Sequence, residues 1–299
     1  MCEMIKRAIQ MGNLRYKIFC FFAYLLGFSN HEIHELEVRN KVLNTFEKKY
    51  GKLIESNNVF TNAKTEENKT VWVCWLQGYN NAPEIVKSCV ESIKYWLTGY
   101  NLILIDENNL FDYIDLPDYV VMKWKKGIIS NTLFSDFIRL SVLEQYGGIW
   151  IDSTVYFTGS LPKYIERNNF FMYRCNIYDI AKFGESWLIK AEPNNFIIKE
   201  TLKLMCEYWK NETKIKDYFQ MFIFMRMVIN KNKNFINQMP IIPSAIPHML
   251  QGYLNEPFDM EIFKDICLIT NIHKLTYKDL NKNENTFSSF IIKNRYKEI

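Results

Sequence analysis

The sequence predicts an α/β fold with a mostly parallel central sheet and an α-helical N-terminal extension. From residue 71 onward, short apolar runs alternate with stretches of helical periodicity, the signature of parallel strands joined by crossover helices. Residues 31–58 instead place apolar side chains at helical spacing among many charges. The 299 residues, 48% of them hydrophobic, can fill a substantial core.

The N-terminal extension is assigned to residues 1–60 and the main domain to residues 71–299. Residues 61–70 (TNAKTEENKT) are polar and mark the boundary between them. Residues 16–28 (YKIFCFFAYLLGF) are strongly apolar and follow four basic residues, but the continuous apolar run is shorter than the roughly twenty residues that span a bilayer. Two alternatives remain for this segment: a helix packed on the protein's own core, or peripheral contact with an anionic membrane.

The elements of the main domain are predicted in order along the chain. Strands are expected at residues 71–76, 100–106, 119–124, 147–154, 170–175 and 186–192. Helices are expected at residues 83–97, 108–114, 131–146, 196–209 and 218–230. Ligands of parallel α/β sheets bind at the carboxyl ends of the strands. The candidate positions are therefore Gln77 with Gly78, Asp106, and the end of the strand at 147–154.

The helix at 131–146 and the strand after it carry the most informative pattern. Asp136 and Arg139 are three residues apart, so they share one helix face, as a surface ion pair or as part of a site. Gly147 and Gly148 can end the helix or let the backbone approach a ligand. The strand then ends on Asp152, which can cap a turn, form a core salt bridge or bind a divalent cation.

Composition and charge exclude several other classes of protein. The net charge is only +4, which argues against a nucleic-acid partner. The seven cysteines are odd in number, widely spaced and free of any C-x-x-C pair, which indicates reduced thiols in a cytoplasmic protein.

The segment SDFIRLSVLEQYGGIWIDST, residues 135–154, resembles the core motif of sugar transferases that bind nucleotide diphosphate sugars: S-D-x-x-R, a leucine-containing helix, then GG-x-[YW]-x-D-x-D. The resemblance is closest to the bacterial capsular polysaccharide synthesis glycosyltransferases of this DXD superfamily, which are similar to glycosyltransferase family 32. It extends over roughly residues 70–290, because VWVCWLQGYNNAPEIVKSCVESIKYW looks like the nucleotide-binding opening and IHKLTYK like the C-terminal block.

This resemblance implies a GT-A fold, which is Rossmann-like and binds a nucleotide sugar, and it implies roles for individual residues. Trp75, Gln77 and Gly78, together with Asp106, would lie near the nucleoside, and Gly147 and Gly148 beside the ligand. Asp136 and Arg139 would hold the donor sugar and its diphosphate. Asp152 would bind the Mn²⁺ or Mg²⁺ that neutralises the leaving diphosphate.

One position departs from the pattern. Thr154 stands where the second acid of the motif is usual, so it offers the cation only a neutral hydroxyl. The C-terminal block supplies candidates for compensation: His273 as a further metal ligand, and Lys274 on the diphosphate. The alternative for these two is a strand-end histidine and a solvated lysine.

The implied function is transfer of a hexose from a UDP-linked donor to a lipid-linked or growing capsular polysaccharide. The resemblance further implies retention of anomeric configuration. The cysteines and the basic, apolar N-terminal segment place the expected location in the cytoplasm, with the inner face of the cell membrane as the site of peripheral contact. Two alternatives remain: a nucleotide-sugar hydrolase, and a catalytically silent nucleotide-sugar-binding subunit of a polysaccharide assembly complex.

Overall fold

The computed structural model describes residues 22, 31–55, 68–175, 178–232, 239–281 and 283–294. The apolar segment predicted at 16–28, apart from Phe22, and most of the predicted boundary at 61–70 lie outside these ranges. Within them, no helix is both long enough and apolar enough to cross a bilayer.

The core of the fold is a five-stranded sheet with the order β2-β1-β3-β6-β5. Its strands are β1 (Thr70–Cys74), β2 (Asn101–Ile105), β3 (Gly148–Ile151), β5 (Phe170–Arg174) and β6 (Gly184–Ala191). β1 pairs in parallel with both β2 and β3, whereas β6 runs antiparallel to its neighbours β3 and β5. Four of the five strands therefore point the same way, which confirms the predicted α/β class and mostly parallel sheet.

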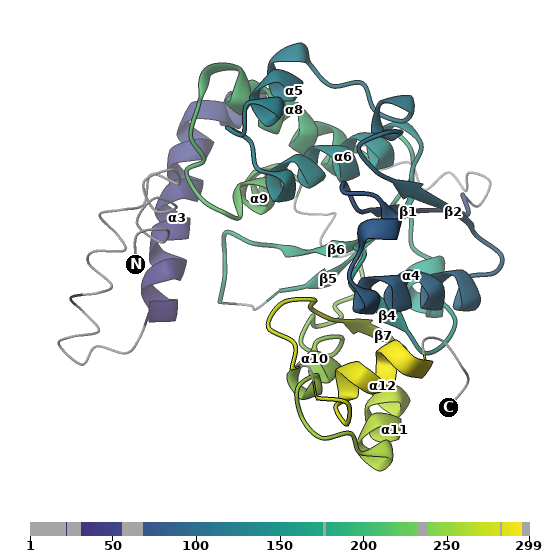
Figure 1. The fold of residues 1–299 in the computed structure, drawn as a ribbon. Helices are drawn as coiled ribbons and strands as arrows, with labels where there is room; N and C mark the ends of the chain where they lie inside the picture. The colour runs from purple at the N-terminus through teal and green to yellow at the C-terminus, as the bar shows by residue number, and fades with distance from the viewer. Residues whose placement is uncertain are drawn as a thin grey trace.

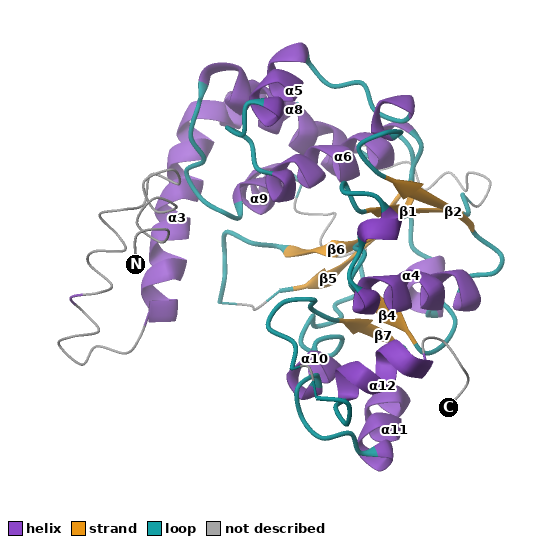
Figure 2. Ribbon diagram, in the orientation of Figure 1, coloured by secondary structure: helices purple, strands orange, loops and turns teal. Residues whose placement is uncertain are grey.

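Helices cover both faces of this sheet (Figure 2). On one face lie α6 (Asn131–Gln145), α8 (Phe196–Asn211) and α9 (Gln220–Lys231), packed on Trp72, Trp150 and Met172. The other face, which includes Val71 and Ile149, packs on α4 (Glu84–Trp96). Successive strand residues thus alternate between two cores, as the two-residue period of a strand requires.

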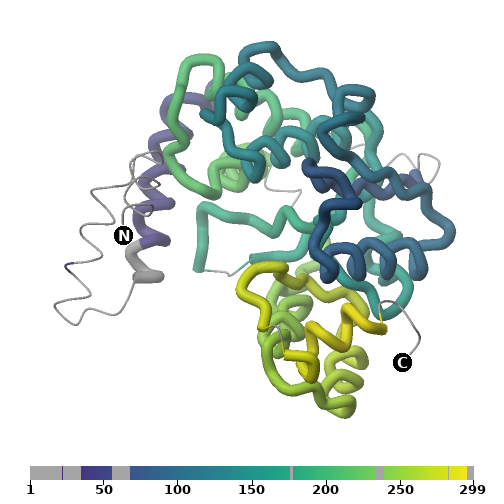
Figure 3. Tube along the Cα trace, viewed as in Figure 1, coloured from purple at the N-terminus to yellow at the C-terminus, as the bar shows by residue number. Residues whose placement is uncertain are grey.

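The N-terminal helix α3 (His31–Tyr50), followed by the 3-10 turn η1 (Gly51–Leu53), lies beside α9 at one side of the molecule (Figures 1 and 3). Phe46 stacks on Phe224 of α9, with ring centroids 4.8 Å apart. Arg39 forms an ion pair with Asp179 in the connection between β5 and β6. The expected N-terminal helix is confirmed, and it packs into the same core as the sheet.

The prediction of a strand at residues 119–124 is wrong, because this segment is helix α5 (Asp118–Lys125). Pro117 precedes its first turn, and Val120 and Trp124, one helical turn apart, are both buried. Lys123 donates hydrogen bonds to the backbone carbonyls of Trp209 and Glu212 at the end of α8. The pair of valines at 120 and 121 suggested a strand, but contacts with a distant helix decide the conformation.

The C-terminal residues form a smaller layer under α4 (Figure 1). A two-stranded ribbon pairs β4 (Val155–Phe157) with β7 (Ile272–Lys274). Around it pack α10 (Met249–Tyr253), α11 (Met260–Ile269) and α12 (Phe287–Asn294). The remaining short elements are η2 (Tyr79–Asn81), η3 (Leu110–Asp112) and α7 (Lys163–Glu166). The ribbon places Lys274, the last residue of β7, beside the residues that follow β3.

Candidate functional site

The site centres on Asp152, which directly follows β3 at the carboxyl edge of the parallel strands. Its Oδ1 accepts hydrogen bonds from Arg139 Nη2 at 3.0 Å and from Trp150 Nε1 at 2.8 Å. Its side chain is 26% exposed. Two donors thus fix one oxygen of a carboxylate that solvent or a ligand can reach.

Helix α6 supplies the partner of this carboxylate. Ser130 caps its N-terminus by accepting a hydrogen bond from Leu133 N. Further along the helix, Arg139 Nη1 contacts Asp136 Oδ1 at 2.5 Å. Arg139 also packs over the Trp150 ring, 5.1 Å from its centroid. The predicted pairing of Asp136 and Arg139 is present, and it is buried on the side facing the sheet instead of lying on the surface.

Burial governs the protonation of this group. Burial raises the pKa of Asp136 to about 6, the Arg139 charge opposes that rise, and the nearby Asp152 charge adds to it. Two carboxylates therefore share one guanidinium. When both carboxylates are ionised, the group of three side chains has a net charge of about −1. Such a site attracts further positive charge.

Lys274 brings that charge from β7. The backbone pairing of β7 with β4 continues one residue beyond the ribbon, where Leu275 N donates to Thr154 O at 2.8 Å. The Lys274 ammonium donates to Thr154 Oγ1 at 2.5 Å and lies 4.0 Å from Asp152 Oδ2. The structure therefore brings together four predicted residues from two distant parts of the sequence, the segment 135–154 and β7: Arg139, Asp152, Thr154 and Lys274.

The ends of β1 and β2 complete the same edge. Gly78 has φ +82°, and a β-carbon there would lie 3.8 Å from Asp106 Oδ2, so Asp106 stands beside this turn. Cys74, the last residue of β1, is close enough to Arg139, Asp152 and Asp106 for their charges to act on its pKa, which burial raises to about 12. The predicted Asp106 therefore lies at the same edge as Asp152. Gln77 is exposed, and its carbonyl accepts a hydrogen bond from Asn81.

An aromatic pair borders this edge. Trp75 meets Tyr277 edge to face, with ring centroids 5.3 Å apart. Trp75 Nε1 is buried and has no hydrogen-bond partner among the described residues. Tyr277, 41% exposed, and Trp150 are site residues that the sequence did not single out. Tyr277 lies in the C-terminal block IHKLTYK, so the signal was present, but its contact with Trp75 depends on the fold.

The geometry gives no support to the prediction that Gly147 and Gly148 approach a ligand. They lie at the start of β3, whereas Asp152 follows its end, about 13 Å away for a four-residue strand. Gly147 N donates to Leu143 O, which ends α6 in a left-handed cap. A β-carbon on Gly148 would lie 2.5 Å from Thr70 O. These glycines serve helix termination and close strand packing.

His273 does not join this group. It lies next to Lys274 in β7, and adjacent strand residues face opposite sides, so its ring points away from Asp152. It is fully buried, Nε2 lies 2.9 Å from Thr158 Oγ1, and burial lowers its pKa to about 3. The geometry gives no support to the predicted role of His273 as a metal ligand.

The residues present fit a divalent cation that is shared with a substrate. Among the described residues there is no group of three or more His, Cys, Asp or Glu side chains that could enclose a metal. Asp152 Oδ2 nevertheless accepts no hydrogen bond from any described residue, because the two donors use Oδ1. Mg²⁺ is commonly held by one or two carboxylates together with substrate phosphates and water. Asp152 provides one such carboxylate.

Comparison with known protein families gives one match. Residues 23–293 match the family described as "Capsular polysaccharide synthesis protein". Two solved structures resemble the chain distantly. One, titled "PaToxG Glycosyltransferase", has a TM-score of 0.37 and 17% identity over 69% of this chain and 86% of that chain.

The other is a transferase that carries two cysteine-to-serine substitutions, with a TM-score of 0.36 and 13% identity over 60% of this chain and 90% of that chain. The curated proteins contain no match. Since the family match spans well over half of its length, the chain belongs to the capsular polysaccharide synthesis protein family.

Proposed function

We propose that this protein is a glycosyltransferase of capsular polysaccharide synthesis with a GT-A fold. It would take a hexose from a UDP-linked donor and pass it to a lipid-linked or growing polysaccharide. The observation that carries the proposal is the group of Asp152, Arg139 and Lys274 at the carboxyl edge of the sheet. Family membership supports the pathway. The donor, the acceptor and the stereochemistry are proposed from the resemblance of residues 135–154 to the sugar-transferase motif.

The donor would lie along the edge from β2 to β3. The Trp75 and Tyr277 rings offer apolar faces for a nucleobase, and Asp106 offers carboxylate oxygens to the ribose hydroxyls. Arg139 and Lys274 supply positive charge for the diphosphate and the donor sugar. A divalent cation bound by Asp152 would supply further charge to neutralise the leaving diphosphate.

The chemistry proposed is substitution with retention, in which the acceptor hydroxyl attacks from the face that the diphosphate leaves. Asp136 and Asp152 are both hydrogen bonded to Arg139, so each is held as a charge partner and not presented as a nucleophile. The departing phosphate oxygen would take the acceptor proton. Catalysis would then come from positioning and from stabilisation of the leaving charge, which Arg139 and Lys274 provide.

The first test is the substitution Asp152→Asn. It keeps the size of the side chain but removes its charge, so we expect turnover to fall by about 100-fold or more while the circular dichroism spectrum stays unchanged. Calorimetric titration with a panel of nucleotide sugars, with Mn²⁺, with Mg²⁺ and with chelator, identifies the donor and reads metal dependence as a change in donor affinity. Transfer is then measured with that donor.

The matched control is Asp265→Asn, which removes the same charge from an exposed position on α11. It should leave both donor binding and turnover at the wild-type level. Undiminished transfer by Asp152→Asn would refute the assignment. Release of free sugar that an acceptor does not suppress would favour the hydrolase, and donor binding without any turnover would favour the silent subunit.

A further inference from the structure

Two arginines lie near each other without acidic partners in the described part of the chain. They are at the carboxyl end of β5, the edge strand of the sheet that lies beyond β6 from the candidate site. Arg174 is the last residue of β5, and Arg226 projects from α9. Arg174 Nη1 and Arg226 Nε are both buried and have no hydrogen-bond partner among the described residues. Neither guanidinium lies within ion-pair distance of a carboxylate in the described part of the chain.

The positive charge of Arg226 acts unfavourably on Arg174. Burial lowers the pKa of Arg174, the Cys175 sulfur opposes that change, and the positive charge of Arg226 lowers the pKa further. Burial also lowers the pKa of Arg226. Glu47 of α3 acts on Arg226 only through space, and its carboxylate accepts a hydrogen bond from Asn230. Half-buried cations without partners are costly, and a bound anion would offset that cost.

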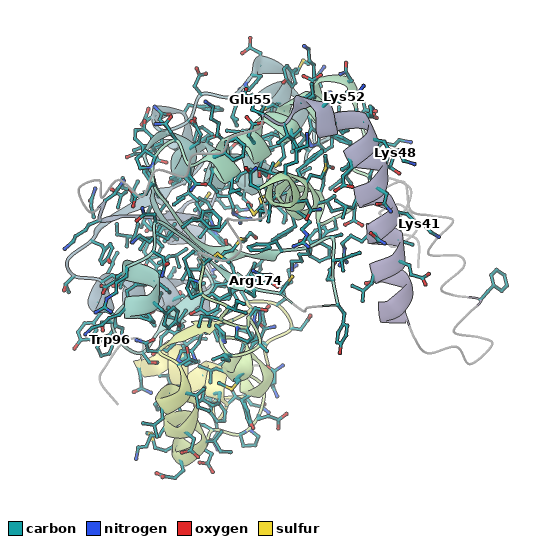
Figure 4. All side chains as sticks on the ribbon, turned by 180° about the vertical axis from the view of Figure 1, so that it is seen from behind. Lys41, Lys48, Lys52, Glu55, Trp96 and Arg174 are labelled. Carbon is teal, nitrogen blue, oxygen red and sulfur yellow. The ribbon has the colours of Figure 1, made fainter. Side chains whose placement is uncertain are left out.

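The surroundings of Arg174 hold it in place. Its guanidinium carbon lies 3.7 Å from the centroid of the Phe183 ring, a stacking contact that orients the plane of the group. Its backbone is hydrogen bonded on both sides to residues 242–244, through Ile242 O and Ser244 N. In Figure 4, Arg174 is labelled near the centre of the view, whereas Lys41 and Lys48 project from α3 at the side of the molecule. Arg174 is half-buried against Phe183, whereas Lys41 and Lys48 are exposed.

The position of the pair relates it to the donor site. Arg174 ends β5 and Asp152 follows β3, and β5 and β3 point the same way with only β6 between them. Two strand spacings separate the strands laterally, and along β6 the position opposite Asp152 is Trp187 while that opposite Arg174 is Gly184, so the two positions are about 14 Å apart. The segment that bonds to Arg174 continues to Pro247, whose carbonyl accepts a hydrogen bond from Lys274 N. One short stretch of chain thus touches both places.

We propose that Arg174 and Arg226 bind a diphosphate group carried by the acceptor, as in a saccharide linked to a lipid through diphosphate, an inference that rests on the proposed glycosyltransferase function. Two guanidinium groups match the charge and the several oxygens of a diphosphate, which arginine binds in bidentate fashion. The acceptor would then be held by its anionic end on the β5 side while its sugar reaches toward Asp152.

The test uses the full chain and its Arg174→Gln Arg226→Gln double variant. Inorganic pyrophosphate is titrated by calorimetry in the presence of excess UDP, which occupies the donor site, and a short prenyl diphosphate is titrated in the same way. We expect wild-type protein to bind both, and the double variant to bind each at least tenfold more weakly while its affinity for UDP is unchanged. The Arg167→Gln variant, which loses an exposed arginine, should bind as wild type does.

Folding and the donor site are checked separately. Removing two repelling cations should leave the Tm unchanged or raise it, so a double variant with weaker binding and an intact Tm supports a ligand role over a structural one. Failure of wild-type protein to bind UDP would count against the proposed function, and pyrophosphate binding would still be read in that case. The proposal is overturned if wild-type protein does not bind pyrophosphate, or if the double variant binds it equally well. Binding of both proteins to phosphatidylglycerol vesicles is also compared, and a double variant that is weakened only in vesicle binding would likewise overturn the proposal.

Discussion

At the scale of single residues, the surroundings of Asp152 and His273 give them opposite characters. Asp152 lies beside Arg139 and Lys274 at an accessible edge. His273 has no charged partner among the described residues, is fully buried, and has a pKa lowered to about 3 by burial. The first arrangement suits ligand binding and the second suits a neutral core residue.

A pH measurement tests this view of His273. Between about pH 6.5 and pH 3 the unfolded chain binds a proton at this histidine and the folded chain does not, so the free energy of unfolding should fall by up to about 1.4 kcal/mol for each unit of acidification. His273→Gln should remove this contribution and flatten the acid limb of the stability curve, measured by urea unfolding from pH 7 to pH 4. Equal slopes for the two proteins would show that His273 is protonated in the folded state.

The sequence predicted the charged residues of the site better than their neighbours. Asp136 and Arg139 follow from helix spacing, and Asp152 follows from the end of a strand, which are local patterns. The burial of His273 could not be predicted, because it depends on which side chains of the β4–β7 ribbon face inward, and that register joins residues more than a hundred positions apart.

At the scale of elements, β3 is held on both sides by closely approaching backbone. Gly148 has φ +96°, and a β-carbon at this position would lie 2.5 Å from Thr70 O of β1. Gly147 makes a similar approach to Ala191 O at the end of β6 and to Pro193 just beyond it. The two glycines therefore set the start of β3, and through its register they set the position of Asp152.

This account predicts a large effect of Gly148→Ala. The substitution combines a disfavoured φ with a backbone clash, so we expect a loss of about 3 kcal/mol in the free energy of unfolding and a Tm lower by about 5 °C or more. Gly99→Ala is the control, since a β-carbon there would meet no atom within 4 Å, and it should change stability by less than about 1 kcal/mol. A similar Tm for both variants would mean that β3 accommodates a side chain at its start.

Helix α5 shows why some elements could not be predicted. Residues 119–124 contain two adjacent valines and a tryptophan, which locally favour a strand. In the structure Trp124 stacks on Phe134, with ring centroids 4.1 Å apart, and Lys123 bonds to the end of α8. The helix is stabilised by these tertiary contacts, whose partners lie up to 89 residues away in the sequence.

At the scale of the whole molecule, the N-terminal helix and the sheet share one core. Leu43, Phe46, Tyr50 and Ile54 are each at most 4% exposed and belong to the same cluster as Trp72 and Trp150. Burial of such side chains stabilises a fold by about 1.5–3 kcal/mol each. Together they contribute about as much as the whole net stability of a typical protein.

Two truncations separate this structural role from the proposed membrane contact. Deletion of residues 1–55 removes all four buried side chains, so the remaining chain should lose its cooperative thermal transition or aggregate. Deletion of residues 1–30 keeps α3 whole, so the Tm should be retained, while binding to anionic vesicles in a sedimentation assay should fall if residues 16–28 contact the membrane. A stable, cooperative protein starting at residue 56 would show that α3 is separable from the core. Vesicle binding that survives the shorter deletion would move the membrane contact to another surface, because the basic and apolar residues proposed to make it would be gone.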